Sequence, residues 1–166
     1  MKSSSTRGRP TVGSRPATAR DVEKILGKLS ARSKSEIHDV GLSPSGGRKR
    51  VIEQHKASRG LAITINDDPV ALLLLEKEGD QIETLFVSKE EYWAAGPFQL
   101  SLLRHAKTIV DKLQADNPGC RIITRSRARD GVADKWFRFL GYDIPEAAEP
   151  GAERVFALQP KQKKSS

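Results

Sequence analysis

The sequence predicts a single domain of the α/β or α+β class. Its 166 residues can bury a hydrophobic core without disulfides or a structural metal. From about residue 61, three short apolar segments separated by turn residues are typical of strands that follow one another directly. From about residue 97, helical and strand-like segments alternate, which is typical of helices that connect strands of one sheet.

The beginning of the chain predicts a short strand and a capped helix. The strand is expected from Thr11 to Pro16, since proline disfavours a helical conformation in the residue before it. Thr18, with Asp21 three residues later, forms the pattern of a capping box. We expect the helix that begins there to end near Ser33.

The central part predicts a second helix and three strands. Residues 34–47, rich in glycine, serine and proline, are expected to be irregular, and the helix that follows should run from about Arg48 to Ser58 and end at Gly60. The turn residues Asn66-Asp67-Asp68-Pro69 favour a hairpin between the first two strands. The three strands are expected at Leu61–Ile65, Val70–Glu76 and Ile82–Ser88.

The remaining elements alternate between helices and strands. A long helix with most of an apolar stripe is expected to end at Asn117-Pro118-Gly119. The helices are expected at about Pro97–Ala115 and Gly131–Leu140, and the strands at Cys120–Thr124, Tyr142–Ile144 and Arg154–Leu158.

Positive charge is concentrated near the beginning of the chain. The net charge is +8, and residues 1–60 hold 14 Lys and Arg against 5 Asp and Glu. We therefore expect a basic flexible arm over residues 1–17, a domain over 18–159 and a basic tail over 160–166. The arm and the second helix could bind nucleic acid or an acidic protein groove, or they could only keep the chain soluble. The candidate contact residues are Lys2, Arg7, Arg9, Arg15, Arg20, Arg48, Lys49 and Arg50.

Several classes of protein and site are excluded by composition. A lone cysteine, Cys120, allows no internal disulfide and no multi-cysteine metal site. The three histidines lack the spacing of metal ligands, and no Ser-His-Asp or P-loop pattern is present. The sequence has neither an apolar segment long enough to span a membrane nor a secretory signal, so we expect a cytoplasmic protein.

Two motifs and the order of the elements resemble the GCN5-related N-acetyltransferase (GNAT) fold. Arg15-Pro-Ala-Thr18 with Asp21 is similar to the family's frequent opening Arg-Pro-Ala-Thr-x-x-Asp. The segment from Asp130 to Tyr142 is similar to its Asn-x-x-Ala-x-x-Phe/Leu-Tyr-x-x-x-Gly-Phe motif, with Gly141-Tyr142 in place of Gly-Phe. The resemblance implies a single GNAT-like domain with a central mixed, mostly antiparallel sheet flanked by about four helices.

The same resemblance shows where the chain departs from an enzyme. Phe137 occupies the position of the tyrosine that protonates the departing coenzyme A thiolate in many family members, and a phenyl ring has no proton to give. The pyrophosphate-binding loop of the family corresponds to a segment with one glycine, Gly96, where Pro97 removes a backbone N–H donor. We therefore expect no cofactor and interpret the aromatic residues of this motif as packing residues.

If acetyl-CoA does bind, the resemblance indicates which residues hold it. Glu83 is then the candidate general base, and otherwise an exposed strand carboxylate. Arg125, Arg127 and Arg129 alternate as in a strand and could bind an acidic partner or a phosphate of coenzyme A, or remain solvated. The expected cofactor-binding residues are Phe86, Val87, Ser88, Gly96 and Gln99.

Within this fold, the chain most resembles small GNAT-like proteins of tailed bacteriophage particles. The resemblance lies in Leu85-Phe86-Val87-Ser88 followed by Tyr92-Trp93, and in the ending Phe139-Leu-Gly141. It implies a non-catalytic structural component of the virion, in the internal core or head–tail region. Such a component would be made in the host cytoplasm and would bind other virion proteins and, through its basic arm, DNA. The alternatives are an active acetyl-CoA-dependent N-acetyltransferase and a free nucleic-acid-binding module.

Overall fold

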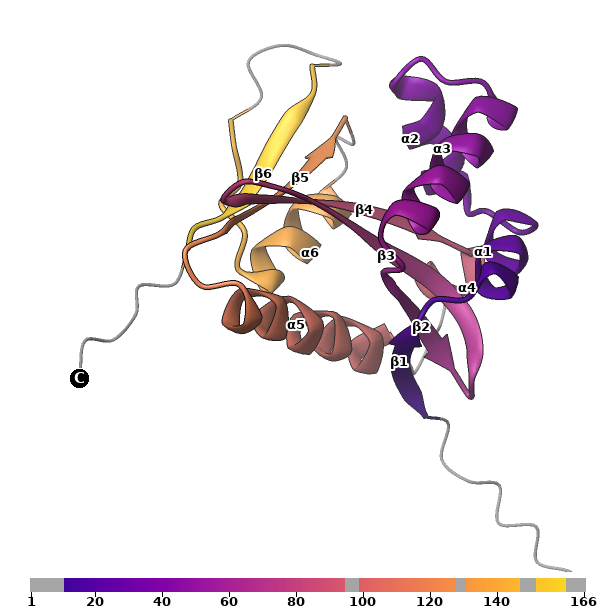
Figure 1. The fold of residues 1–166 in the computed structure, drawn as a ribbon, viewed down its shortest axis with the longest axis horizontal. Coiled ribbons are helices and arrows are strands. Elements are labelled where there is room, and N and C mark those ends of the chain that lie inside the picture. Colours follow the sequence, from indigo (N-terminus) through magenta and orange to yellow (C-terminus); the bar gives the residue numbers. More distant parts are fainter. Residues whose placement is uncertain (1–10, 95–98, 128–130, 147–151, 161–166) are drawn as a thin grey trace, which may run out of the picture.

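The computed structural model describes residues 11–94, 99–127, 131–146 and 152–160, and it confirms the predicted fold class. One mixed sheet has the strand order β1-β2-β3-β4-β5-β6 and is antiparallel except between β4 and β5 (Figure 1). The strands are β1 (Val12–Pro16), β2 (Leu61–Ile65), β3 (Asp68–Glu78), β4 (Gln81–Ser88), β5 (Arg121–Ser126) and β6 (Arg154–Leu158). The helices are α1 (Ala19–Leu26), α2 (Ala31–Asp39), α3 (Pro44–Ala57), α4 (Glu90–Trp93), α5 (Gln99–Asp116) and α6 (Gly131–Leu140).

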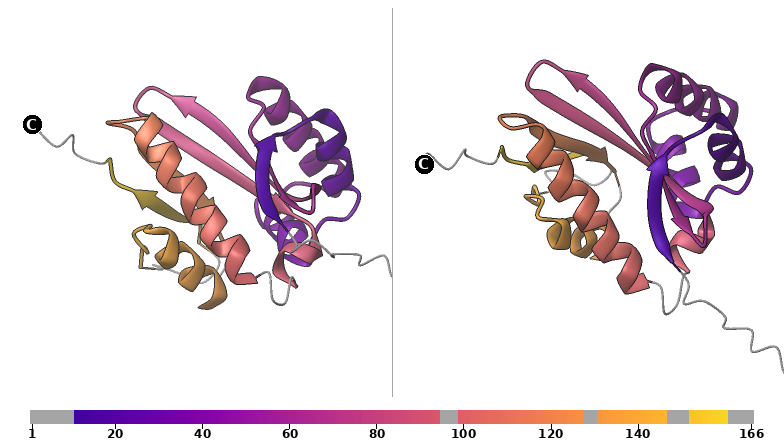
Figure 2. Two further views of the ribbon diagram at one scale, coloured as in Figure 1. Left: turned by 90° about the horizontal axis from the view of Figure 1, so that it is seen from below. Right: turned by 60° about the horizontal axis from the view of Figure 1, so that its bottom comes forward.

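Helices cover both faces of the sheet. The views in Figures 1 and 2 place α1, α2 and α3 on one side, and α5 and α6 on the other. Successive strand residues point to opposite faces, so Ile82 packs in the core cluster beneath α5 and α6, whereas Val87 packs with α1 and α3. The alternation along β4 therefore decides which side chains reach each face of the sheet.

Two tight turns fix the register of the central strands. Asn66 and Asp67 adopt positive φ angles of 49° and 67° between β2 and β3, as a two-residue primed turn requires. Gly79, at φ 61°, closes the turn between β3 and β4. The predicted hairpin is confirmed, and the three predicted strands are present, with β3 longer at both ends than expected.

The helical region before β2 differs from the prediction. The first helix does not reach Ser33: it ends at Leu26, and a separate helix, α2, follows a turn. The stretch 34–47 is not irregular, because it contains most of α2 and the beginning of α3. The serine caps explain both errors: the Ser30 side chain accepts from the Ser33 backbone and begins α2, and that of Ser43 accepts from Gly46 and begins α3.

One end of the sheet differs from the prediction, and the other agrees with it. Tyr142–Ile144 is not a strand, since only an isolated bridge joins Asp143 to Ala157. Val12–Pro16 pairs with β2, which confirms the strand expected at Thr11–Pro16 and places this part of residues 1–17 in the sheet. Residues 1–10 and 161–166 lie outside the described part of the chain, and the expected basic arm and tail there stay predictions.

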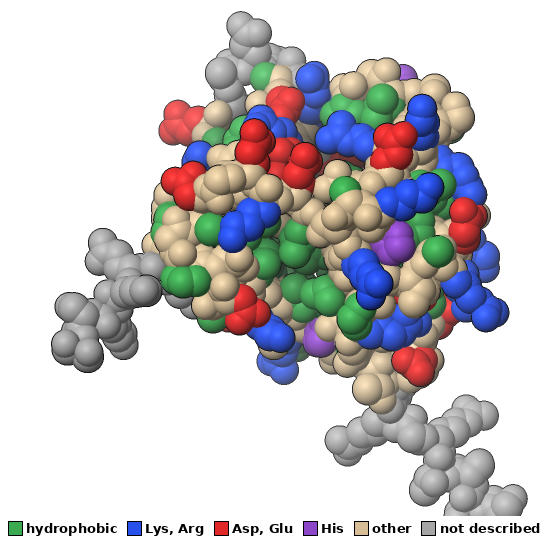
Figure 3. Space-filling view, viewed as in Figure 1, with side chains coloured by type: hydrophobic (Ala, Val, Ile, Leu, Met, Phe, Trp, Pro, Cys, Tyr) green, Lys and Arg blue, Asp and Glu red, His purple; other side chains and the backbone are tan. Residues whose placement is uncertain are grey.

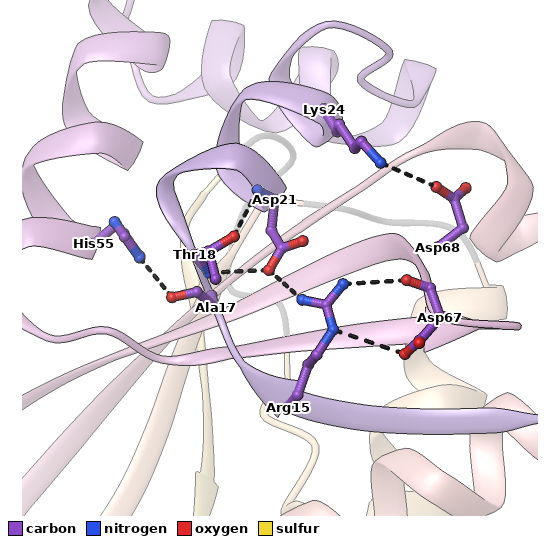
Figure 4. A network of polar contacts seen from close by, with 8 residues as sticks. All are labelled: Arg15, Ala17, Thr18, Asp21, Lys24, His55, Asp67 and Asp68. Atoms are coloured by element: carbon purple, nitrogen blue, oxygen red, sulfur yellow. Dashed lines mark hydrogen bonds and ion pairs between the residues drawn. The ribbon is translucent and has the colours of Figure 1, made fainter.

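A buried carboxylate connects β1 to α1 and to the turn after β2 (Figure 4). Asp21 is 4% exposed, accepts a hydrogen bond from the Thr18 backbone at 2.9 Å and forms an ion pair with Arg15. Arg15 also donates to the backbone oxygen of Asp67 at 3.1 Å. Burial opposes the charged form of Asp21, but the bonds from Arg15 and Thr18 outweigh it and lower the pKa of this carboxyl below its ordinary 3.8.

Asp21→Asn should lower the free energy of unfolding at pH 7 by about 1–3 kcal/mol, the range for a hydrogen bond to a charged group. Because the pKa of Asp21 is lowered in the folded state, its contribution is complete above the ordinary carboxyl pKa. It is lost as the pH falls through the lowered value, so the difference between wild type and variant should shrink below about pH 4. Urea unfolding from pH 3 to 7 measures this difference.

Asp67→Asn is the matched control for this substitution. The Asp67 side chain is 95% exposed and lies 3.9 Å from Arg15, so the change should alter stability by less than about 0.5 kcal/mol. A deficit for Asp21→Asn that persists unchanged at pH 3 would contradict the assignment of the effect to the charge of Asp21.

Candidate active site

The sheet opens where β4 and β5 separate. These strands pair in parallel only from Gln81–Thr84 against Arg121–Thr124. Within the described residues, the rest of β4 has no strand neighbour on this side, while β5 continues against β6. Lys89 N donates to Val70 O, so the backbone groups of Lys89 point toward β3. In an antiparallel ladder this direction alternates from one residue to the next, and the backbone N–H and C=O groups of Phe86 and Ser88 therefore point away from β3 into the gap.

Two cavities, one on each face of the sheet, meet at this gap. The cavity beneath the sheet, on the side of α5 and α6, has a volume of about 80 Å³ and is mostly apolar. The cavity on the side of α2 and α3 has about 280 Å³ and a mixture of aliphatic, acidic and arginine side chains. Figure 3 shows hydrophobic side chains gathered at the centre of one face of the molecule, with charged side chains around them. The residues that line both cavities are Ser33, Glu36, Thr84, Leu85, Phe86 and Arg125.

Aromatic side chains narrow the smaller cavity. The rings of Phe86, Trp93 and Trp136 lie with their centroids 5.4 to 6.3 Å apart, and the Arg32 guanidinium lies 4.6 Å from the centroid of Trp93. At about 80 Å³, the space is well below the roughly 300–1,000 Å³ of typical ligand pockets. A ligand that enters from this side therefore requires Trp93 or Trp136 to move.

Phe137 lies in the core beside this cavity. Its ring stacks on Phe156 with a centroid distance of 4.2 Å and contacts the Tyr142 ring edge-to-face at 5.3 Å. The side chain is 9% exposed. This arrangement agrees with the packing role predicted for Phe137, whereas Phe139, also expected to pack, is 43% exposed.

Serine side chains occupy part of the gap. Ser30 N donates to Ser88 O at 2.8 Å, and Ser88 N donates to Ser33 Oγ at 3.0 Å. Trp93 Nε1 donates to Ser88 Oγ at 2.9 Å. The beginning of α2 thus takes the place of a neighbouring strand at Ser88 and leaves Phe86 as the position whose backbone faces the open gap.

The structure brings together only some of the predicted cofactor-binding residues. Phe86 and Ser88 line the smaller cavity, whereas Val87 lies on the opposite face and lines the larger one. Gln99 begins α5 and lines a separate groove of about 200 Å³. Gly96, with Pro97, lies outside the described residues.

The predicted base Glu83 is part of an ion-pair network. Arg125 Nε donates to Glu83 at 3.1 Å, and Arg125 NH1 donates to Glu153 at 3.2 Å. The bond to Glu153 has the largest effect and raises the pKa of Arg125; burial opposes it, and the charges of Glu83 and Glu153 add to the increase. Glu83 lines the larger cavity, and its Oε1 accepts the bond from Arg125. Arg127 lines the same cavity, and Arg129 lies outside the described residues.

Two chemically competent residues of the site were not predicted. Glu36 of α2 lines both cavities, and Ser126 Oγ lies 3.5 Å from its Oε1. Glu36 was missed because residues 34–47 were expected to be irregular. The spacing of Ser30 and Ser33 was nevertheless a signal for the beginning of a helix. Tyr142 also lines the smaller cavity and was assigned to a strand that does not form.

Of the predicted basic contact residues, Arg15, Arg20, Arg48, Lys49 and Arg50 lie in the described part of the chain, and Lys2, Arg7 and Arg9 lie outside it. Three of the described five already pair with acidic residues of this chain. Arg15 pairs with Asp21, Arg48 with Glu23 at 2.5 Å, and Lys49 with Glu53 at 3.9 Å. Arg20 and Arg50 are exposed. A contact with DNA or a virion protein stays a prediction.

Among the described residues, no three His, Cys, Asp or Glu side chains lie close enough together to hold a metal ion. No helix in the same part of the chain combines the length and the hydropathy needed to cross a membrane.

The fold is that of the GNAT acetyltransferases. The GNAT domain of S. lividans PAT is 20% identical, with a TM-score of 0.60, over 92% of this chain and 91% of its own. The ribosomal-protein-S18-alanine N-acetyltransferase from Escherichia coli is 15% identical, with a TM-score of 0.61, over 94% of this chain and 99% of its own. YncA from Salmonella typhimurium, solved with its cofactor acetyl-CoA, is 10% identical, with a TM-score of 0.58, over 93% of this chain and 96% of its own. No protein-family model matches the sequence, and no curated protein matches it. At these identities the similarity establishes the fold alone.

Proposed function

We propose that this GNAT-fold protein is an acetyl-CoA-dependent N-acetyltransferase. The observation that supports it best is the gap between β4 and β5, where cavities from opposite faces of the sheet meet. Such a gap lets a thioester and an amine approach the same point from two sides, which is the arrangement that a two-substrate transfer requires. The proposal adopts the alternative, rather than the first, of our sequence-based hypotheses.

The residues at the gap fit an acyl-pantetheine chain. The backbone of Phe86 points into the gap and can hydrogen-bond an extended amide chain as a neighbouring strand would. The Trp93 and Trp136 side chains obstruct this side, and the proposal requires one of them to move when the cofactor binds. When bound, acetyl-CoA supplies the activated acetyl group.

The larger cavity offers a carboxylate to the amine. Of the four glutamates that line it, Glu76, Glu83 and Glu153 do not line the smaller cavity. Glu36 lines both cavities and so lies where the two substrates would meet. We assign to Glu36 the role of accepting the proton that the amine loses.

Isothermal titration calorimetry of acetyl-CoA against the purified protein tests the proposal. We expect a dissociation constant in the micromolar range, with binding by pantetheine fragments weaker than by the intact cofactor. Transfer of the acetyl group should then be detectable on members of an amine and peptide panel. Absence of binding heat at two temperatures would overturn the proposal.

A second candidate is a non-catalytic scaffold, as the resemblance to phage virion proteins implies. The serine bonds at Ser88, the packed tryptophans and the phenyl ring of Phe137 favour it, because they partly close the place where a cofactor would lie. Stoichiometric presence in purified phage particles, with no binding of acetyl-CoA, would establish this role. Binding and transfer in solution would favour the enzyme.

A further inference from the structure

We propose that the outer surface of α1, α2 and α3, with the segments that follow α1 and α3, binds the phosphate backbone of a double-stranded nucleic acid. The contacts are electrostatic and do not read the sequence of the duplex. This inference goes beyond acetyl transfer and uses no residue to which the proposed function assigns a role. The exposed cations of this surface, which we call the basic face, are Arg20, Lys28, Lys34, Arg50, Lys56 and Arg59.

Charge is divided unevenly between this region and the rest of the described chain. Residues 18–60 hold 10 Lys and Arg against 5 Asp and Glu, whereas the described residues from 61 onward hold 11 against 14. In Figure 3, Lys and Arg side chains gather over α1, α2 and α3, in the right half of the view, and Asp and Glu side chains gather at its upper left. A polyanion is therefore attracted to these helices more strongly than to the rest of the described surface.

The cations of the basic face are available to a partner. Among the residues that the structure describes, none of the six forms an ion pair with an acidic side chain. Other basic residues of the same helices do pair within the chain, such as Lys24 with Asp68 at 3.8 Å. The sequence predicted contacts for Arg20 and Arg50 but not for the other four.

Three of the six cations lie near the junction where the end of α3 meets the beginning of α1. His55 Nε2 lies 2.9 Å from Ala17 O (Figure 4), and Ala17 N donates to Gly60 O at 3.2 Å. These bonds hold the last turn of α3 and the segment after it against the residue that precedes the cap of α1. Like charges brought together in this way repel one another, and a phosphate bound at the junction would offset the repulsion. The three cations are Arg20, Lys56 and Arg59.

The composition of the basic face favours a nucleic acid over an acidic protein. Residues 18–60 contain no Phe, Tyr, Trp or Met, the residue types in which protein interfaces are enriched. In this range, all of which the structure describes, Val40 is the only large hydrophobic residue that is exposed. Interfaces with DNA are instead polar and strongly positive. The lack of aromatic rings also provides no surface on which unpaired bases could stack, which favours a duplex over a single strand.

Fluorescence anisotropy of a labelled duplex of about 20 base pairs, titrated with the full chain, tests the proposal. We expect a dissociation constant of about 10⁻⁴–10⁻⁶ M at physiological salt. If all six cations contact phosphates, the affinity should fall about 10³-fold between 50 and 200 mM salt. The same duplex sequence made of DNA and of RNA shows which of the two binds more tightly. Absence of binding to both duplexes at 50 mM salt would overturn the proposal.

A triple variant assigns the binding to the basic face. Arg20→Gln, Lys56→Gln and Arg59→Gln together remove the three charges at the junction of α1 and α3. We expect the affinity for the duplex to fall more than about tenfold. The slope of the logarithm of the affinity against that of the salt concentration should decrease in magnitude by about 3, since each lost phosphate contact reduces it by about 1.

The matched control removes the same charge from outside the basic face. Arg104→Gln, Lys112→Gln and Arg121→Gln replace two arginines and one lysine that are exposed and form no ion pair within the described part of the chain. The affinity for the duplex should change less than about threefold. Equal losses in the two triple variants would show that net charge, rather than the basic face, determines binding, and would overturn the proposal.

Poly-glutamate that carries the same charge as the duplex is the probe for an acidic protein. If it binds as tightly as the duplex and loses affinity in the same triple variant, the partner is an acidic protein and the proposal is wrong. These titrations contain no acetyl-CoA and measure no transfer. Their outcome is therefore independent of whether the proposed function holds.

Discussion

Replacing Phe156 with alanine is expected to lower the free energy of unfolding by about 3–5 kcal/mol, the largest stability effect that we expect of a single substitution. Phe156 is fully buried, at 0% exposure, in the cluster beneath α5 and α6. Its ring stacks on Phe137, and the Arg154 guanidinium lies 4.8 Å from its centroid. Alanine would leave a cavity between β6 and α6 and remove the aromatic surface that faces Arg154.

Urea unfolding followed by circular dichroism measures this loss. Phe139→Ala is the matched control, because Phe139 lies on α6 but is 43% exposed. It should change stability by about 0.5 kcal/mol or less. Equal losses in the two variants would show that the cluster around Phe156 is not the core described above.

Glu36→Gln is expected to lower kcat for acetyl transfer by about 10²–10⁴-fold, the contribution of a positioned general base. The amide keeps the shape of the side chain but cannot accept a proton from the amine. Affinity for acetyl-CoA should be preserved, because the amide keeps the size and shape of the side chain that lines the smaller cavity. Steady-state kinetics over pH 5 to 9, with an amine acceptor identified by the panel, measures both effects.

Glu83→Gln is the comparison for this prediction. Glu83 has the same side chain, lies on the same cavity and is bonded to Arg125, which keeps Glu153 as a second partner. We expect its kcat to stay within about tenfold of the wild type. If Glu83→Gln loses the greater part of the rate and Glu36→Gln does not, the base is the residue that the sequence predicted.

The sheet was predictable because its signals are local. The apolar segments after Gly60 and the turn residues Asn66 and Asp67 determine three strands and their order without reference to the rest of the chain. The capping box of Thr18 and Asp21 likewise predicts the beginning of α1, which the structure confirms. The prediction missed α2 and the beginning of α3, which have few apolar residues and begin at the serine caps Ser30 and Ser43. In addition, α2 is bonded to β4 through Ser33 and Ser88.

The candidate site was less predictable because it is made of long-range contacts. Glu36 and Thr84 line the same cavities because α2 lies near the place where β5 leaves β4, and nothing in the spacing of these residues shows it. Glu83 was named as a candidate base because of the family resemblance. That resemblance indicates the strand on which Glu83 lies, but it does not predict the ion pair with Arg125. Phe86 and Ser88 line the same cavity because alternate strand residues share a face, and their role in holding a cofactor stays a prediction.

The single parallel pairing has a mechanical consequence. In the described part of the chain, the antiparallel strands β1–β4 and β5–β6 are joined by a ladder of only four residue pairs. A small rotation about so short a ladder would widen the opening while both antiparallel halves stay intact. A molecule bound across the opening would contact both halves and hold them together. At a free concentration 100 times its dissociation constant, such a ligand adds about 2.7 kcal/mol to the stability of the folded state. The melting temperature of the protein would therefore report a bridging ligand even where no reaction follows.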